Sequence, residues 1–530
     1  MPDPLATIGP RVMMPQTERA RPDQVVNSAG GYVFAIDDMK RALRFLIMGT
    51  AGGTYYVGEK DLTKDNTDLI RRLADGDQAD ELHQLVLDVS LNGRAAKQQP
   101  TLFALAALCA SKRPEVRARA LASIPDVCRT GTMFFTFLGY AQNFRGWGRA
   151  FKRAVARWYT EKSPEDLAWQ VTKYRQREGW THRDVLRLAK PKGVTGERAN
   201  VLDFVCHPDA DTMKGPVPDV INAFLVAQAS TSPVKLATLV AKHHLSWEQL
   251  PDTALAMPEV WDAMIPTLGI TALVRQLVRL ASMGYTKPFS DGAREVVKRL
   301  TDTYAISRSR IHPMTVLLGS ATYRSGHGVK GSLSWTPNPD VMVALEAMFY
   351  AAFGNVEPAG KRTLLGLDVS GSMGSSFAGT VMSCVEVEMA LAMVTMRSEP
   401  EVFPMAFSSG FVPLPLTKLS TLGEAVGMAQ GVPFERTDCA VPMMWASRNK
   451  VAVDTFLIST DNETWHGSVH PFQALQRYRD IMGIPARLAI VAMTSTGFSI
   501  APPDDAGCLD LVGMDTSTPA ILTEFSAGRL

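Results

Sequence analysis

The amino-acid sequence predicts a chain in two parts, a long α-helical array followed by an α/β domain with a parallel sheet. Apolar residues recur at helical spacing from about residue 30 to residue 350. From residue 361 onward, short apolar runs rich in β-branched residues predict strands. One of these runs, residues 363–367, ends in the sequence DVSGS at residues 368–372. With 530 residues, the chain is also too long for a single hydrophobic core.

Composition places the chain among folded globular proteins, since 46% of its residues are hydrophobic and 20% are charged. No apolar stretch reaches the ~18 residues that a membrane-spanning helix needs, and the first residues lack the pattern of a secretion signal. The six cysteines are widely spaced and form no C-x-x-C pair, which favours reduced thiols over disulfides or a zinc site. We therefore expect a cytoplasmic protein.

The first 29 residues are rich in Pro, Arg and polar residues and are expected to be irregular. The helical region is expected to cover residues 30–355, and the α/β domain residues 356–530. The boundary falls in the segment 354–361. The first helices are predicted at residues 37–48, 62–73, 82–91, 102–109 and 116–122.

One helix pair can be predicted from its terminal residues. Ser163 has the character of an N-cap, Pro164 suits the first helical position, and Gly179 is expected to end that helix. Thr181 then caps a second helix, with Asp184 three residues further on. Two helices joined by a tight turn form the unit of HEAT and TPR arrays. Because no strict period is visible, the sequence favours an irregular solenoid, and a plain helical bundle is the alternative.

The net charge of +2 hides an uneven distribution. Residues 361–530 hold 11 Lys and Arg against 17 Asp and Glu, a net charge of −6. Residues 141–200 hold 14 Lys and Arg against 6 Asp and Glu, a net charge of +8. Because the positive charge is concentrated in one segment, a polyanionic partner is a serious candidate.

Basic and aromatic side chains are interleaved within this segment. Nucleic acid suits such a surface, since phosphates take the positive charge and unpaired bases stack on the rings. The alternative is a solvated helix face with no partner. The basic candidates are Arg149, Lys152, Arg153 and Arg157, with Trp147, Trp158 and Tyr159 between them, and then Lys173 and Arg177, four residues apart on the predicted helix.

A glycine-rich stretch, residues 319–331, interrupts the helical pattern and carries three further candidates, Arg324, His327 and Lys330. Glycines beside basic and aromatic residues suit an exposed loop that approaches a ligand. A connector without a ligand is the alternative.

The DVSGS segment predicts a cation site in the α/β domain. Asp368, Ser370 and Ser372 would deliver one carboxylate and two hydroxyls to the end of a buried strand. Thr437 follows in a loop flanked by Gly and Pro, and Asp461 ends the strand predicted at 454–460. Such hard oxygen ligands suit Mg²⁺ or Mn²⁺. The alternative is a serine-rich turn, with the later Thr and Asp unrelated to it.

The arrangement of these five residues resembles a von Willebrand factor A domain with its metal-ion-dependent adhesion site. The remaining strands are predicted at 402–407, 486–493 and 508–512. A metal held in this way keeps one coordination position open for an incoming carboxylate, which makes it a recruitment site. Motifs of common hydrolases and nucleotide-binding enzymes are absent from the sequence, so we expect no enzymatic activity. His466 and His470 are expected at the surface.

Three longer motifs carry a resemblance to a known family. They are LIMGTAGGTYYVG at residues 46–58, TKYRQREGW at 172–180 and TDCA at 437–440. Together with the order of the predicted domains, they resemble the Ro ribonucleoprotein (TROVE-domain) family over residues 30–530. The short N-terminus suggests a bacterial Ro orthologue.

The resemblance implies a ring-shaped, irregular HEAT-like α-solenoid followed by a von Willebrand factor A (Rossmann-like) domain that bridges its ends. It further implies that small non-coding Y-like RNA binds the outer surface, and that single-stranded 3′ ends of misfolded RNA enter the central hole. Lys173 and Arg177 match RNA-contacting positions of the family, whereas Lys190 stands where the family has a histidine. Lys190 keeps the positive charge, but a stacking role is in doubt.

The implied role is RNA quality control or degradation, with a 3′-exoribonuclease as a further partner and with neither membrane nor DNA as a ligand. A rival interpretation is a metal-dependent protein-binding scaffold or adhesion module, in which RNA binding is incidental. A metal-dependent hydrolase is a third, weaker alternative.

Overall fold

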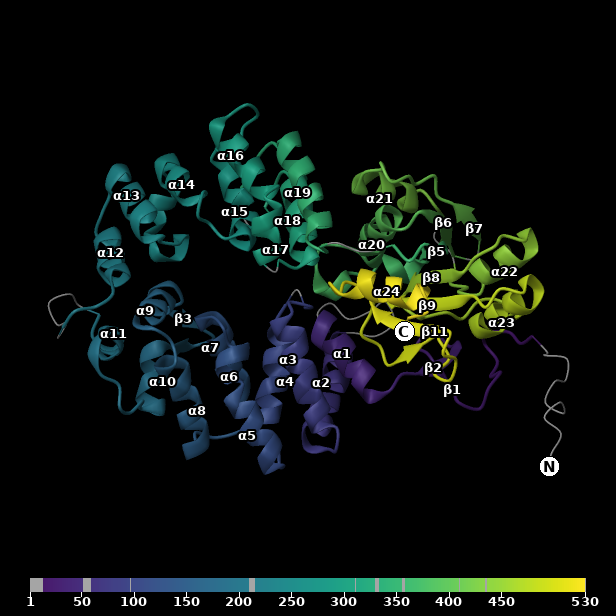
Figure 1. Ribbon diagram of the computed structural model, residues 1–530, viewed down its shortest axis with the longest axis horizontal. Coiled ribbons are helices and arrows are strands. Elements are labelled where there is room, and N and C mark those ends of the chain that lie inside the picture. Colours follow the sequence, from purple (N-terminus) through teal and green to yellow (C-terminus); the bar gives the residue numbers. More distant parts are fainter. Residues whose placement is uncertain are drawn as a thin grey trace. The chain divides into compact units, whose positions relative to one another are not determined.

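The computed structural model of the chain describes residues 13–50, 59–95, 97–208, 215–309, 311–328, 333–354, 358–408, 410–433 and 436–529 (Figure 1). Two predicted features lie outside these residues, namely the 51–58 portion of the first family motif and the candidate Lys330. The chain forms two compact units. We call residues 68–352 the helical unit, and residues up to 67 together with those from 353 the A-domain unit.

The helical unit contains α-helices only, apart from one short hairpin and two 3₁₀ turns in its described part. Consecutive helices pack in pairs, such as α13 with α14 and α18 with α19. The preceding helix α2 (Glu59–Asp75) crosses the boundary between the units. The helices are α3 (Ala79–Leu91), α4 (Gln99–Cys109), α5 (Pro114–Ala122), α6 (Ile124–Val127), α7 (Gly131–Ala141), α8 (Arg149–Thr160), α9 (Pro164–Lys173), α10 (His182–Ala189), α11 (Gly196–Cys206), α12 (Asp219–Gln228), α13 (Pro233–His243), α14 (Pro258–Met264), α15 (Ile270–Ser282), α16 (Asp291–Leu300), α17 (Thr303–Ser309), α18 (Pro313–Ser325) and α19 (Pro339–Ala351).

One hydrogen bond joins the beginning and the end of the helical unit. His312, the N-cap of α18, accepts the Met314 N–H at Nδ1 (3.1 Å). Its Nε2 therefore carries the proton and donates to the Arg94 carbonyl oxygen at 2.9 Å, across 218 residues of sequence. Such a contact agrees with a helical array that closes on itself.

The helix predicted to run from Pro164 to Gly179 is shorter than expected. Ser163 caps it as predicted, but α9 ends at Lys173. A hairpin follows, in which Gln176–Arg177 (β3) pairs with Trp180–Thr181 (β4). The two residues between the strands, Glu178 and Gly179, both have positive φ (51° and 75°). A two-residue turn needs this conformation to match the right-handed twist of the strands that it joins. Gly179 therefore marks a hairpin and not a helix end.

The predicted second helix of this pair is confirmed in detail. The Thr181 hydroxyl accepts the Asp184 N–H (3.2 Å), and the Asp184 carboxylate accepts the Thr181 N–H (3.1 Å), which is a capping box. The helix α10 ends where Lys190 adopts a left-handed conformation (φ 48°).

The glycine-rich stretch is not a loop over most of its length, contrary to the prediction. Helix α18 continues through Gly319 to Ser325. A Cβ atom at Gly319 would lie 2.3 Å from Val274 Cγ1 of α15, so the glycine lets two helices pack closely. Arg324 and His327 are exposed, at the end of α18 and just beyond it.

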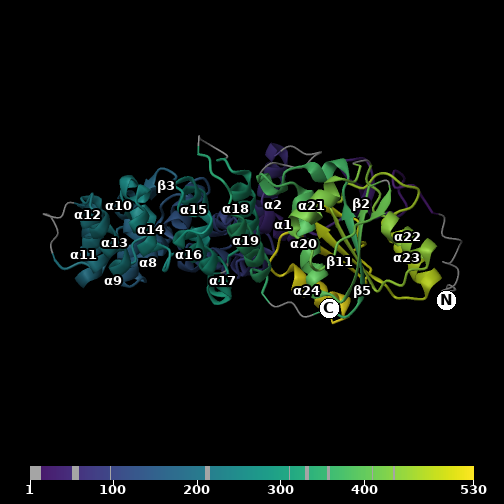
Figure 2. The same cartoon turned by 90° about the horizontal axis from the view of Figure 1, so that it is seen from above.

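The A-domain unit is built on a six-stranded sheet in the order β11-β9-β8-β5-β6-β7, parallel except for β7. All strands predicted for this domain are confirmed. Helices cover both faces, with α20, α21 and α24 on one side and α22 and α23 on the other (Figures 1 and 2). The elements are β5 (Arg362–Asp368), α20 (Cys384–Ser398), β6 (Glu401–Phe407), β7 (Phe411–Pro413), α21 (Leu422–Gln430), α22 (Val441–Asn449), β8 (Thr455–Thr460), α23 (Pro471–Met482), β9 (Arg487–Ala492), β11 (Cys508–Val512) and α24 (Thr518–Ser526).

The beginning of the chain belongs to this unit, and we call residues 13–36 the N-terminal segment. It is not irregular throughout, because β1 (Gln24–Val26) pairs with β2 (Tyr32–Ala35), which in turn pairs with β10 (Phe498–Ser499). These pairings explain the difference from the prediction, since the partner strand β10 lies more than 400 residues further along the chain.

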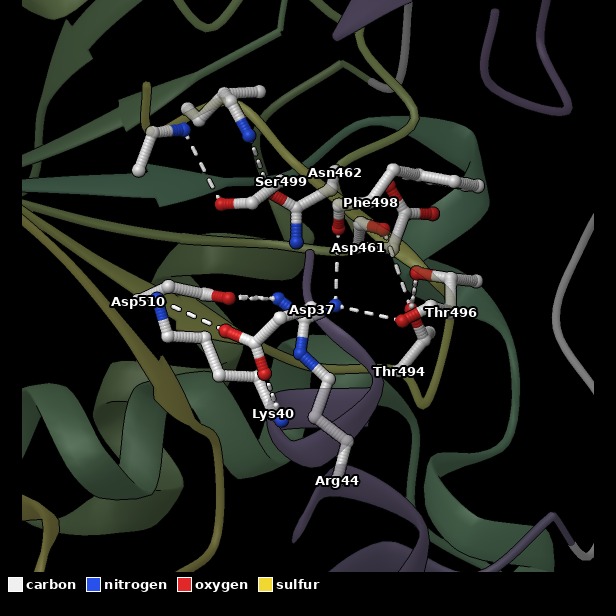
Figure 3. Close-up of polar contacts among 12 residues, drawn as sticks. Asp37, Lys40, Arg44, Asp461, Asn462, Thr494, Thr496, Phe498, Ser499 and Asp510 are labelled. Carbon is white, nitrogen blue, oxygen red and sulfur yellow. Dashed lines mark hydrogen bonds and ion pairs between the residues drawn. The ribbon is translucent and has the colours of Figure 1, made fainter. Parts of the chain in front are cut away.

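Helix α1 (Asp38–Met48) follows, with Asp37 as its N-cap and Gly49 at its end, as predicted. Its Arg44 is 1% exposed and forms an ion pair with Asp510 of β11, in which Nη2 donates to both carboxylate oxygens at 2.5 and 2.7 Å (Figure 3). The same guanidinium donates to the carbonyl oxygens of Thr496 (2.9 Å) and Phe498 (3.0 Å). The ion pair thus fixes α1 to the edge of the sheet.

Candidate functional site

The strand β5 delivers the DVSGS residues to the carboxyl edge of the sheet. Asp368 is the last residue of β5 and is completely buried. Its Oδ1 accepts the Ser370 N–H at 2.9 Å, and the Ser370 and Ser372 hydroxyls lie 3.1 Å apart. The three side chains predicted from the sequence to lie together are therefore adjacent.

The neighbouring strand β8 brings Asp461 to the same edge. Thr460 ends β8, and its hydroxyl donates to Asp368 Oδ2 at 2.6 Å. Asp461 is 1% exposed, and its Oδ1 accepts the Glu463 N–H at 2.9 Å. Its Oδ2 is buried and has no hydrogen-bond partner among the described residues. A buried carboxylate oxygen without a partner has the character of a ligand atom.

Thr437 lies in a loop that is held beside this edge. It is 1% exposed, and its carbonyl oxygen accepts the N–H groups of Trp465 (3.3 Å) and His466 (3.0 Å). The next residue, Asp438, donates its N–H to the Ser408 carbonyl oxygen after β6 (3.2 Å). The Thr437 loop is thus attached to the loop that follows Asp461.

Burial controls the electrostatics of this site. It raises the pKa of Asp368 to about 7, and the charge of Asp461 adds to the effect, while the Ser370 and Thr460 hydroxyls oppose it. Burial also raises the pKa of Asp461 and that of Glu388, whose Oε1 accepts the Asp368 N–H at 2.7 Å. Carboxylates gathered in a buried site call for a compensating cation.

The donor set fits a small divalent cation bound through oxygen. Two carboxylates and several hydroxyls are ligands that Mg²⁺ and Mn²⁺ accept, with water completing the shell. Within the described part of the chain, no group of three or more His, Cys, Asp or Glu side chains is arranged to hold a metal. A cation here would therefore depend on the hydroxyls as well as on Asp368 and Asp461.

One of the two histidines expected at the surface is buried. His470 is 0% exposed, its Nε2 donates to the Glu18 carbonyl oxygen at 2.8 Å, and its Nδ1 lies 3.3 Å from Gln24 Nε2. The prediction for His470 is wrong because the N-terminal segment covers it. His466 is half-buried.

The basic candidates of α8 do reach the surface. Arg149, Arg153 and Arg157 are exposed and Lys152 is half-exposed. Arg157 forms an ion pair with Glu161 (2.5 Å), one turn further along the chain.

The aromatic residues predicted to accompany these cations are mostly in the core. Trp158 is 0% exposed, stacks on Phe134 with ring centroids 4.5 Å apart, and donates its indole N–H to the Cys128 carbonyl oxygen (2.6 Å). Tyr159 is also 0% exposed, and its hydroxyl lies 2.9 Å from His182 Nδ1. The prediction that these two rings stack on bases is wrong, because they occupy the apolar side of an amphipathic helix. Trp147 is half-exposed.

Helix α10, which packs against α8, adds cations that the sequence analysis missed. Arg183 and Arg187 are exposed one turn apart, and the predicted candidate Lys190 is exposed just beyond them. Their spacing on the polar side of a capped helix was the available signal. We use the name basic surface for the exposed Arg149, Arg153 and Arg157 of α8 with Arg183, Arg187 and Lys190 of α10 and its end.

Lys173 and Arg177 do not share a helix face, contrary to the prediction. Arg177 is exposed on β3. Lys173 is instead partly enclosed, with Nζ 4.3 Å from the centre of the Trp169 ring, 5.4 Å from that of Trp247 and 3.9 Å from Glu248 Oε2. Burial lowers the pKa of Lys173, while Glu248 opposes the effect. The helix ends at Lys173, so the next residues turn away from its axis.

Two adjoining hollows lie beside the hairpin. One, of about 500 Å³, is lined by polar residues that include Lys173 and Gln176. The other, of about 280 Å³, is mostly apolar and is lined by Phe204 and Phe224 among others. Arg175 and Thr181 line both hollows. The exposed Arg175 guanidinium lies 5.7 Å from the centre of the Phe224 ring, so a cation stands at the junction of a polar and an aromatic hollow.

Comparison with known proteins assigns both parts of the chain. A family model described as the TROVE domain matches residues 25–214 and 240–321, and one described as the Ro60 vWA domain matches residues 362–526. The chain belongs to the Ro family. The resemblance predicted from the three sequence motifs is thereby confirmed.

Members of the Ro family match almost the entire chain. A protein named RNA-binding protein RO60 from Deinococcus radiodurans is 40% identical over 522 residues, which cover 97% of this chain and 98% of the relative. One of the same name from Caenorhabditis elegans is 35% identical and covers 97% of this chain and 92% of the relative. The full-length bacterial match agrees with the expectation of a bacterial Ro orthologue.

The fold of the Ro family also matches in three dimensions. The crystal structure of the Deinococcus radiodurans RO (RSR) protein superposes with a TM-score of 0.71 at 38% identity, covering 93% of this chain and all of that one. The predicted fold class, a helical HEAT-like region followed by a von Willebrand factor A domain, is therefore confirmed. Among the described residues, no helix is both long enough and apolar enough to cross a membrane.

Proposed function

We propose that this protein binds RNA through the basic surface of its helical unit. The observation that carries the proposal is the set of exposed cations on α8 and α10, two helices packed side by side. Most of these side chains, including Arg149, Arg153, Arg183 and Arg187, form no ion pair in the described part of the chain, so their charge is available to phosphates. Two relatives that match nearly the whole chain are named RNA-binding proteins.

The finer function that we propose is that of a Ro-type RNA chaperone. Small non-coding Y-like RNA binds the outer basic surface, and single-stranded 3′ ends of misfolded RNA enter a central hole of the helical array. A 3′-exoribonuclease acts on the RNA that the protein presents, so the chain itself performs no chemistry. This function is RNA quality control in the cytoplasm.

The hollows beside the hairpin suit an unpaired nucleotide of such an RNA. The aromatic hollow would take the base, and Arg175 would contact a neighbouring phosphate. Arg177 lies on the same hairpin, and Lys190 lies at the end of α10, so both would extend the contact with RNA. Arg324 and His327 at the end of α18 remain candidate contacts of a separate strand.

The test is a filter-binding series with a structured RNA that has a single-stranded 3′ end, measured over a range of salt. Replacing Arg183 and Arg187 together by alanine should weaken binding and reduce the slope of log K against log[salt] by about 2, because two phosphate contacts are lost. The matched control is Arg294→Ala with Lys298→Ala, which removes two exposed cations one turn apart on α16. Equal affinity and slope in both double variants would overturn the proposal.

For the A-domain unit we propose a Mg²⁺ or Mn²⁺ site held by Asp368, Ser370, Ser372, Thr437 and Asp461. The unpartnered, buried Asp461 Oδ2 supports it. The cation would supply a coordination position for a carboxylate of a protein partner. Titration of the full chain with Mn²⁺ should show binding that Asp368→Ala abolishes, and a wild-type chain that binds no Mn²⁺ would refute the site.

A second candidate function follows from the same site, namely a metal-dependent protein-binding scaffold in which RNA is incidental. Asp368→Ala separates the two functions. The variant loses the protein partner in either case. Under our proposal it keeps its RNA affinity and with it the main function, whereas under the scaffold function the loss of the partner abolishes the activity.

A further inference from the structure

The N-terminal segment covers the loops that carry two of the five candidate ligands. Its Gln16 is 0% exposed. The Gln16 N–H donates to the Gly467 carbonyl oxygen (3.2 Å), and the Gln16 carbonyl oxygen accepts the Tyr32 N–H (2.8 Å). The main chain at Gln16 is therefore fixed on both sides, by the A domain and by β2.

The Gln16 side chain joins the Thr437 loop to the loop after Asp461. Its Nε2 donates to Asp438 Oδ1 at 2.7 Å and to the Val469 carbonyl oxygen at 2.9 Å. Its Oε1 accepts the Thr464 hydroxyl. Both amide hydrogens and the amide oxygen are thus engaged, so one buried side chain connects three points of the A domain.

Thr464 extends this connection within the A domain. Its hydroxyl accepts the Cys439 N–H at 3.2 Å and lies 3.4 Å from the Thr437 carbonyl oxygen. The loop that carries Thr437 is therefore bonded to Thr464 directly and through Gln16.

Two other residues of the N-terminal segment, Asn27 and Gly31, contact the loop that follows Asp461. Asn27 Nδ2 donates to the carbonyl oxygens of Asn462 (3.2 Å) and Thr464 (2.8 Å). A Cβ atom at Gly31 would lie 1.9 Å from the Thr464 carbonyl oxygen, so the two main chains approach as closely as glycine permits.

From another side, Arg44 binds the carbonyl oxygens of Thr496 and Phe498, and the nearby Thr494 hydroxyl donates to the Asp461 carbonyl oxygen at 3.2 Å (Figure 3). The chain from Asp461 to Thr464 is consequently held by residues that precede the helical unit in sequence, as well as by the sheet.

We propose that Gln16 is a positioning residue for the cation site, so that a side chain from outside residues 362–526 of the A domain helps to set the geometry of the ligands. The inference rests on the proposed cation site. Asp368 and Asp461 are fixed by adjacent paired strands, but Thr437 stands on a loop with no strand to set its distance from Asp461. Gln16 and Thr464 add side-chain bonds to the main-chain bonds that Trp465 and His466 donate to Thr437, and ligand geometry depends on the hydrogen bonds that hold the ligand loops.

The experiment is a titration of the full-length protein with Mn²⁺, followed by calorimetry and by the electron paramagnetic resonance of free Mn²⁺. Gln16→Ala should weaken Mn²⁺ binding by about 10- to 100-fold, the usual loss when a supporting hydrogen bond of a metal site is removed. The matched control is Gln24→Ala. Gln24 is a second buried glutamine of the same segment, but its amide bonds Ala20, Arg21, Tyr32 and His470, the N-cap of α23, and has no bond to Asp438 or Thr464. We expect its Mn²⁺ affinity to stay within about 2-fold of wild type, since no bond to the residues next to Thr437 and Asp461 is lost.

A second pair of variants decides the matter if Gln16→Ala does not fold. Thr464→Val keeps the shape of the side chain but removes its bonds to Gln16 and Cys439, and should weaken Mn²⁺ binding, whereas Thr464→Ser should restore it. If Thr464→Val weakened Mn²⁺ binding only through a general loss of stability, Gln24→Ala would weaken it equally, and Thr464→Ser would not restore it.

The outcomes separate this inference from the cation site itself. If the wild-type chain binds no Mn²⁺, or if Asp368→Ala binds it equally well, the cation site fails and the inference fails with it. If wild type binds Mn²⁺ and Asp368→Ala does not, while Gln16→Ala and Thr464→Val bind as wild type does, only the role of Gln16 is overturned.

Discussion

The buried ion pair between Arg44 and Asp510 makes a strong prediction about stability. Replacing Arg44 by methionine, which has a similar length but no charge, removes four hydrogen bonds in one step. Two of them satisfied the Thr496 and Phe498 carbonyl oxygens, and two satisfied the carboxylate of Asp510, whose side chain is 7% exposed. The variant therefore leaves a buried carboxylate without its counter-charge.

The size of the effect follows from these losses. Breaking a buried ion pair by removing one partner costs roughly 3–5 kcal/mol, since the remaining charge stays desolvated. Each carbonyl left without a donor adds a cost on the order of 1 kcal/mol where water cannot reach it. We expect Arg44→Met to lower the free energy of unfolding by about 5–7 kcal/mol, and Arg44→Met with Asp510→Leu to lower it by clearly less, because the double variant buries no charge.

The effect should also depend on pH. Burial raises the pKa of Asp510, and Arg44 opposes that rise. Without Arg44 the pKa rises further, and an acid with a raised pKa in the folded state loses stability as the pH increases from its unfolded value of about 4 toward its folded value. The difference between Arg44→Met and wild type should therefore be smallest at low pH and grow as the pH rises.

Urea unfolding of the full chain measures these differences, and amide hydrogen exchange of β10 and β11 assigns them to the A-domain unit. A double variant as unstable as Arg44→Met alone would refute the reasoning, because the cost would then come from lost packing and not from the unpaired carboxylate. A destabilisation of Arg44→Met that is independent of pH would refute it equally.

Three further predictions concern the helical unit. Gly319→Ala, which places a Cβ 2.3 Å from Val274 Cγ1, should cost about 1–3 kcal/mol in urea unfolding; no cost would mean that α15 and α18 separate freely. Trp158→Ala should cost about 3–5 kcal/mol, since a stacked core ring is removed, and RNA binding by the fraction that remains folded should be unchanged. Lys173→Met should leave the salt dependence of RNA binding as in wild type, because Nζ is occupied by aromatic rings and Glu248; a slope reduced by about 1 would show instead that Lys173 contacts a phosphate.

The parts of the structure that the sequence predicted are those with local causes. The strand 363–367 and the residues Asp368 to Ser372 are adjacent in sequence, so an apolar run and its polar end predict a strand and its site together. Thr181 and Asp184 form a capping box within one turn, and their side-chain chemistry alone predicts the start of α10. Such features need no knowledge of distant residues.

The errors arise where a residue has two physical uses. Gly179 follows a helix-like pattern, but beside Glu178 it forms a hairpin turn, and both uses favour glycine. Gly319 predicts a loop by composition, whereas its role is to admit Val274 of a neighbouring helix. Trp158 suits either base stacking or a core, and only the packing of α8 on Phe134 decides between them.

The contacts of the N-terminal segment could not be predicted from local patterns at all. Gln16 and Asp438 are 422 residues apart, and nothing in either neighbourhood indicates the other. The consequence for function is that the cation site depends on contacts between distant parts of the chain, whereas the basic surface does not. The cations of the basic surface stand on α8 and α10, which are separated in the chain only by α9 and the hairpin. Their exposure requires only that these two helices form. The ligands of the cation site come from three separate stretches of the A domain, and a fourth stretch, at the opposite end of the chain, holds two of their loops together. Substitutions in the N-terminal segment should therefore be tested first for their effect on cation binding.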